Sequence, residues 1–172
     1  MLKVFLKSLL FCLGVCLSVY GYANDGQPIS REYQLKTAYL FHFAELAEWP
    51  HSTPVTICLQ GNNPIRAYLP ILNGQQIDNK AVRVKLGTPI AIEECQIVFF
   101  SELNALSKPV LEQARKYHVL LVSDAEEFAE KGGMIQFTLR DNKLKLVVNL
   151  TAVKLAGLKL SSKLLRMAEI LE

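Results

Sequence analysis

The chain has 172 residues, about half of them hydrophobic, and a formal net charge of +3. This length is enough to bury the core of one domain, and we expect no second domain. Two of the lysines fall in an N-terminal leader, so the remaining chain is nearly neutral. The charge therefore gives no reason to expect nucleic acid as a partner.

The first 23 residues have the layout of a secretory signal peptide. Lys3 and Lys7 give a positive start, residues 9–19 are almost wholly apolar, and Ala23 ends a stretch with small residues at the cleavage positions. We expect cleavage after Ala23 and a single exported domain at 24–172. The alternative, a retained membrane anchor, is disfavoured because the apolar run is shorter than the roughly 20 residues of a membrane-spanning helix.

Four cysteines divide between the leader and the exported domain. Cys12 and Cys16 would leave with the leader, so Cys58 and Cys95 remain. In an oxidising compartment the last two are expected to form a disulfide, with two free thiols or half of a metal site as the alternatives. No other cysteine or histidine lies at close spacing to either, so we expect no metal and no cofactor.

The exported chain begins with a predicted helix over 31–48, with Ser30 as its N-cap and Trp49-Pro50 as its end. Its buried face is expected to carry Leu35, Tyr39, His42, Leu46 and Trp49, widened by Leu40, Phe43 and Ala47. Phe41 then projects through the opposite polar face. This aromatic residue is a candidate contact with a partner or with a second copy, although lone exposed apolar residues are also common.

Helices and strands then alternate along the chain. Short helices are expected at 65–72 and 109–117, and strands at 55–59, 82–86, 95–100 and 118–122. Residues 95–100 are continuously apolar, which is typical of a central strand. Residues 82–86 alternate apolar and basic side chains, which places that strand nearer an edge.

The remaining chain predicts a short helix at 125–130, an antiparallel hairpin formed by 134–139 and 143–148, and helix from Asn149 with a break at Gly157. A last amphipathic helix, capped by Ser161 or Ser162, is expected to bury Leu164, Leu165, Ala168 and Leu171. These elements predict a three-layer α/β domain with a mixed sheet of about six strands and a C-terminal β-hairpin plus helix.

The sequence lacks the motifs of common catalytic and nucleotide-binding sites. There is no Gly-x-Ser-x-Gly, His-Glu-x-x-His, phosphate-binding P-loop or Gly-x-Gly-x-x-Gly. The three histidines are scattered, and general acid–base catalysis needs a positioned partner. We therefore expect no enzyme and no catalytic residue.

The best candidate for a ligand pocket is Ser123 and Asp124 together with Gly132, Gly133 and Met134. The serine and aspartate follow a predicted strand, and open α/β sheets bind ligands beyond the carboxyl ends of their strands. The alternative is structural: Ser123 or Asp124 caps the helix at 125–130, and the glycines end it.

The C-terminal part of the chain is locally basic. Between residues 140 and 172, three acidic residues accompany seven basic ones, which are Arg140, Lys143, Lys145, Lys154, Lys159, Lys163 and Arg166. This excess would suit an acidic partner surface or anionic lipid, and solvated faces explain it equally well.

Taken in order, several short motifs resemble one known family. They are AYLFHF at 38–43, EWP at 48–50, IC at 57–58, CQIVFF at 95–100, VSD at 122–124, GGMI at 132–135 and GLKLSSKLL at 157–165. Together they resemble the YfiR-like family of periplasmic proteins over nearly the whole exported chain.

The resemblance implies a soluble periplasmic regulator that binds the periplasmic sensory domain of an inner-membrane diguanylate cyclase and holds it inactive. Release of that cyclase would raise cyclic di-GMP and favour biofilm growth. It also implies a homodimer and a disulfide-dependent stability, and it supplies no catalytic residue. The alternative function is a periplasmic small-ligand-binding sensor module with another signalling partner.

Overall fold

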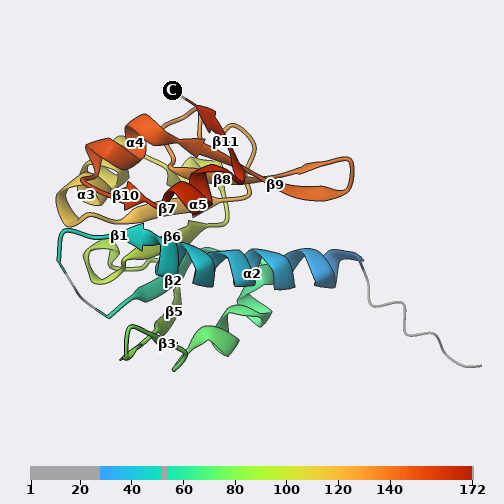
Figure 1. Ribbon diagram of the computed structural model, residues 1–172, viewed down its shortest axis with the longest axis horizontal. Coiled ribbons are helices and arrows are strands. Elements are labelled where there is room, and N and C mark those ends of the chain that lie inside the picture. The colour runs from blue at the N-terminus through green and yellow to red at the C-terminus, as the bar shows by residue number, and fades with distance from the viewer. Residues whose placement is uncertain (1–27, 52–53, 172) are drawn as a thin grey trace, which may run out of the picture.

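A computed structural model describes residues 28–51 and 54–171, so the expected signal peptide lies outside the described residues. The described chain is built around a seven-stranded mixed sheet with the order β11-β9-β8-β7-β6-β2-β5 (Figure 1). Its strands are β2 (Thr56–Gln60), β5 (Arg83–Gly87), β6 (Ile97–Phe100), β7 (Leu120–Ser123), β8 (Ile135–Arg140), β9 (Lys143–Asn149) and β11 (Ala168–Leu171). The predicted mixed α/β fold is confirmed, with one strand more than expected.

Helices and smaller strand pairs surround this sheet. The α-helices are α2 (Pro28–Leu46), α3 (Lys108–Tyr117), α4 (Leu150–Leu155) and α5 (Ser162–Leu165). Single 3-10 turns occur at η1 (Pro64–Ala67), η2 (Leu69–Leu72), η3 (Ile92–Glu94) and η4 (Leu103–Ala105). Two-stranded pairs join β1 (Ala47–Glu48) to β10 (Lys159–Leu160) and β3 (Gln76–Ile77) to β4 (Lys80–Ala81).

The strand pattern follows the sequence closely in the middle of the chain. β5, β2, β6, β7 and β8 run parallel to one another, whereas β8 and β9 form the predicted antiparallel hairpin. The continuously apolar β6 is buried at every residue and lies centrally, while the alternating β5 is an edge strand. Continuous and alternating hydrophobicity thus separated the central strand from the edge strand.

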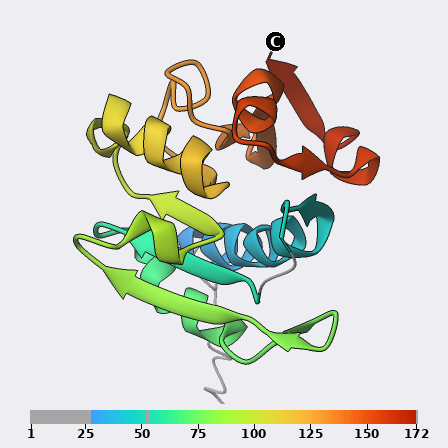
Figure 2. The ribbon, with the colours of Figure 1, turned by 90° about the vertical axis from the view of Figure 1, so that its left-hand side faces the viewer.

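Helix α2 covers one face of the sheet through aromatic packing. Phe43 of α2 stacks on Phe137 of β8 with ring centroids 5.7 Å apart, and Phe99 of β6 lies 6.4 Å from the same ring. Phe100 follows Phe99 and faces the other way, where it meets Phe128 at 6.3 Å. Figure 2 shows the strands with α2 on the far side and α3 on the near side.

The predicted buried face of α2 was rotated from the true one. The residues of α2 and β1 that are buried are Lys36, Thr37, Leu40, Phe43, Ala44 and Ala47. Leu35, which was predicted to be buried, is 44% exposed. Phe41, which was predicted to project into solvent, is half-buried and packs against the core. The helix also begins earlier, at Pro28, so Ser30 lies inside its first turn.

One predicted helix does not form, and the predicted C-terminal helix is shortened to a single turn. Residues 125–130 make a series of turns, and only one helical turn, α5, follows Ser161, whose hydroxyl accepts a hydrogen bond from Leu164 N. The chain then enters β11, which pairs in parallel with β9. The free edge of β9 offers a row of backbone partners, and this pairing outweighs the helical pattern of the sequence.

Candidate functional site

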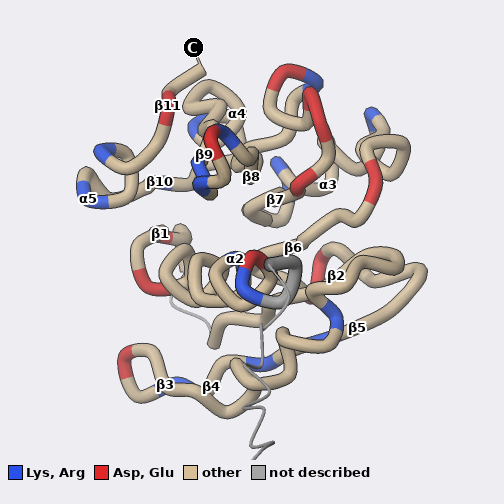
Figure 3. The backbone as a smooth tube through the Cα atoms, turned by 90° about the vertical axis from the view of Figure 1, so that its right-hand side faces the viewer, with Lys and Arg blue, Asp and Glu red and all other residues tan. Residues whose placement is uncertain are grey.

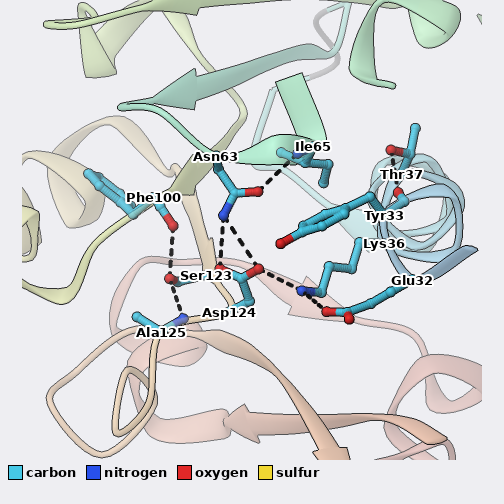
Figure 4. Close-up of polar contacts among 10 residues, drawn as sticks. All are labelled: Glu32, Tyr33, Lys36, Thr37, Asn63, Ile65, Phe100, Ser123, Asp124 and Ala125. Atoms are coloured by element: carbon cyan, nitrogen blue, oxygen red, sulfur yellow. Dashed lines mark hydrogen bonds and ion pairs between the residues drawn. The ribbon is translucent and has the colours of Figure 1, made fainter. Parts of the chain in front are cut away.

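Charged and polar side chains meet beyond the carboxyl ends of the central strands. Asp124 follows β7, Asn63 follows β2, and Glu32 and Lys36 come from the N-terminal half of α2. Figure 4 shows these four residues pointing toward one another, and we call them the Asp124 cluster. This edge is where open α/β sheets place their ligands.

Lys36 is the centre of the cluster. It is 3% exposed, and its Nζ donates to Asp124 Oδ2 at 2.6 Å and ion-pairs with Glu32. The same ammonium lies 4.7 Å from the centroid of the Tyr33 ring, within the range of a cation–π contact. A buried lysine needs such partners because desolvating an unpaired charge costs several kcal/mol.

Asn63 connects the aspartate to the loop after β2. Its Nδ2 donates to Asp124 Oδ1 at 3.2 Å, and its Oδ1 accepts from Ile65 N at 3.0 Å, which caps η1. The Asp124 cluster therefore ties three segments together: α2, the end of β7 and the start of η1.

The charge state of the cluster follows from this geometry. Burial alone lowers the pKa of Lys36, but the hydrogen bonds and charges of Asp124 and Glu32 outweigh it, so the pKa is raised overall. The pKa of Tyr33 is also raised, chiefly by burial, with Lys36 opposing this effect and Asp124 and Glu32 adding to it. Lys36 is thus a cation at neutral pH.

An open pocket of about 240 Å³ lies beside the cluster. It is lined by Glu32, Lys36, Asp124, Glu126, Gln136, Phe137, Thr138, Leu139 and Leu144. Three carboxylates and one ammonium lie beside the β8–β9 hairpin, which contributes both polar and apolar side chains. Such a pocket can hold a small polar molecule.

Comparison with known proteins identifies the family. Residues 33–169, most of the chain, match the YfiR/HmsC-like family. The chain belongs to this family. The predicted resemblance is therefore confirmed, while a comparison with curated proteins gave no match.

The disulfide expected of this YfiR/HmsC-like protein is present. Cys58 of β2 is bonded to Cys95, which precedes β6, with their Cα atoms 6.0 Å apart. Cys58 pairs with Val98 in the sheet, one residue before Phe99, so the bridge lies on the sheet face opposite α2. Both sulfur-bearing residues are buried, at 0% and 1% exposure.

Of the five residues predicted for a ligand pocket, only Asp124 lines the pocket beside the cluster. Ser123 is buried; its hydroxyl donates to Phe100 O at 2.8 Å and accepts from Ala125 N at 3.0 Å. It therefore holds the turn after β7.

The Gly132–Met134 stretch serves packing instead. A Cβ on Gly133 would lie 2.1 Å from the Phe128 ring, and Met134 is 2% exposed. The two glycines let the chain turn closely against the side chains of Phe128 and Leu111. A ligand-binding role for these residues stays a prediction.

Sequence reasoning missed Glu32, Lys36 and Asn63. Glu32 and Lys36 are one helical turn apart, which marks an ion pair, but such pairs are common on solvent faces. The rotated helix face placed Lys36 away from the core. Asn63 was interpreted as a turn residue, and the sequence around it gives no sign of a contact with Asp124.

The described residues contain neither a metal-binding cluster nor a membrane-spanning helix. Within residues 28–51 and 54–171, no three or more His, Cys, Asp or Glu side chains are grouped so as to hold a metal ion. In the same part of the chain, no helix combines the length and the apolar character needed to cross a membrane.

Proposed function

We propose that this protein is a non-enzymatic periplasmic regulator that binds and represses the periplasmic sensory domain of an inner-membrane diguanylate cyclase. The observation that carries the proposal is the match of residues 33–169 to the YfiR/HmsC-like family, whose members are regulators. Repression would lower cyclic di-GMP and restrain biofilm formation.

The sequence and the disulfide support the periplasmic part of this proposal. The leader at 1–23 is removed during export, and the mature domain at 24–172 carries a buried disulfide, which oxidising compartments favour. After cleavage the mature domain does not itself span the membrane, whereas its proposed partner is membrane-anchored.

The arrangement of the Asp124 cluster supports binding over catalysis. Lys36 is a fixed cation between two carboxylates, and the Ser123 hydroxyl is engaged with two backbone groups. These side chains hold segments of the fold in place. The protein acts as a homodimer that binds its partner directly. Phe41, which is half-buried against the core, is the proposed contact with the partner or with the second copy.

The proposal predicts that the mature, oxidised protein retains a membrane diguanylate cyclase from solubilised inner membrane. The measurement is affinity capture followed by mass spectrometry, with and without reductant. Capture that is lost on reduction would make the Cys58–Cys95 bond part of the switch. Retention of no signalling protein under either condition contradicts the repressor function.

A second candidate function is small-ligand sensing, which the open polar pocket beside Asp124 favours. In that case a periplasmic metabolite raises the melting temperature in a saturable way, because a ligand bound only by the folded state stabilises it. Asp124→Asn should remove this shift. A broad metabolite panel without any shift would count against the sensor.

A further inference from the structure

An apolar groove runs along the outer side of α2, away from the Asp124 cluster. Helix α2 lines it with Leu35, Ala38, Tyr39, His42 and Leu46, and the α5 region adds Lys163 and Met167. We call it the α2–α5 groove; its volume is about 270 Å³. Leu35 is 44% exposed and Met167 45%, so large apolar side chains face solvent here.

The length of the groove along α2 suits a helix. The lining residues of α2 recur at helical spacing from Leu35 to Leu46, so they form one stripe that rises by about 16 Å. That length matches about three turns of a partner helix. The exposed Ala38 near the centre of the stripe leaves room for a close approach.

The rim of the groove is basic. Lys163 lines it, Arg31 lies one turn before Leu35 on the same face of α2, and Arg166 is next to Met167. All three are exposed, and none forms an ion pair with a described residue. Figure 3 shows Lys and Arg gathered along α5 and beside β10.

The charge of the rim selects among possible occupants. A second copy docked by two-fold symmetry would bring the same basic rim against itself, and like charges across an interface are costly. A partner surface with acidic residues around an apolar stripe complements both the groove and its rim. Glu45, near the C-terminal end of α2, is hydrogen-bonded to His42, with 2.9 Å between Glu45 Oε2 and His42 Nδ1.

We propose that the α2–α5 groove binds an acidic amphipathic helix of a partner protein. Apolar side chains of that helix lie along Leu35, Ala38 and Leu46, and its carboxylates meet Lys163, Arg166 and Arg31. Resting on the proposed function, the helix belongs to the periplasmic part of the regulated cyclase.

A labelled peptide tests the groove without the cyclase. The probe is a 15-residue helical peptide with leucines along one face and glutamates elsewhere, compared with a counterpart in which lysines replace the glutamates. Fluorescence anisotropy is expected to show at least about tenfold tighter binding of the acidic peptide, weakened by added salt. Leu35→Glu and Lys163→Glu should each weaken that binding about tenfold or more.

Ile71→Glu is the matched control. Ile71 is 71% exposed on η2, outside the groove, so this variant adds the same charge and should bind the acidic peptide normally. Leu35 is exposed, so Leu35→Glu should keep its melting temperature within a few degrees. Equal affinity for the two peptides, or unchanged affinity in both groove variants, would overturn the proposal. A homodimer that Leu35→Glu dissociates without any effect on peptide binding would overturn it as well.

Affinity capture with the same variants separates this inference from the proposed function. If the groove variants weaken peptide binding but no cyclase is captured, the groove is supported as a binding site and the cyclase is excluded as its partner. If the wild type, Leu35→Glu and Lys163→Glu all capture a cyclase equally well, the proposed function is supported and the groove is excluded as the binding site.

Discussion

Lys36→Met is expected to lower the free energy of unfolding by about 3–5 kcal/mol, the usual cost of breaking a buried ion pair. Methionine fills a similar volume, but Asp124 and Glu32, whose side chains are 15% and 21% exposed, lose their shared cation. The Asn63 amide remains as the only other donor to Asp124 among the described residues. Urea denaturation at neutral pH measures the difference.

Lys85→Met is the control, because Lys85 pairs with Glu94 in solvent, where both side chains are about half exposed. Its cost should stay below about 1 kcal/mol. Equal costs for the two variants would show that the Asp124 cluster contributes no more than a surface ion pair.

The pH profile gives a second check on Lys36. Its pKa is raised on folding, so its charge stabilises the fold fully below the unfolded pKa of about 10.4, and this contribution is lost as pH rises through the higher folded pKa. Wild-type stability should therefore decline above about pH 10, and Lys36→Met should flatten that decline. Some decline remains in the variant, because the pKa of Tyr33 is also raised.

Helix α2 links the two candidate surfaces of the molecule, the Asp124 cluster and the α2–α5 groove. Lys36 anchors its inner side to the end of β7, whereas its neighbour Leu35 lies in the α2–α5 groove. Loss of the Lys36 contacts should weaken partner binding only indirectly, if it destabilises the position of α2. Leu35→Glu should weaken binding in a stably folded protein.

The sequence predicted the sheet better than it predicted the helices around it. The continuous apolar run of β6 and the alternation in β8 and β9 are local signals that identify a strand and its environment. β11 was missed because its pairing with β9 involves residues more than twenty positions away, and its own four residues also suit a helix.

The candidate site was only half accessible to sequence reasoning. Asp124 follows an apolar strand, so the topology rule for α/β sheets located it. Lys36 was missed because the apolar side chains of α2 are not confined to its buried face: Leu35 is exposed and Lys36 is buried, so a shift of one residue in the assumed buried face exchanges the two. Tertiary contacts such as the packing of Phe43 on Phe137, which α2's own sequence does not encode, fix that rotation.

Removing the disulfide is the second change with a large expected effect. The bond joins residues 37 positions apart, and freeing a loop of this length should cost about 4 kcal/mol through the entropy of the unfolded chain. Cys58→Ala/Cys95→Ala should nevertheless fold at room temperature, because the sheet packs on both faces and keeps its core. Urea denaturation of the oxidised, reduced and double-alanine proteins measures both statements.

The double-alanine protein is also the control for the reductant, to which its stability should not respond. In the native protein both cysteines are buried, so reduction at neutral pH should need local opening and proceed slowly without denaturant. The bond lies on the face opposite α2, so its loss should act on the α2–α5 groove through stability and not through direct contact. A reduced protein wholly unfolded at room temperature would contradict this account, because the bridge and not the core would then hold the domain together.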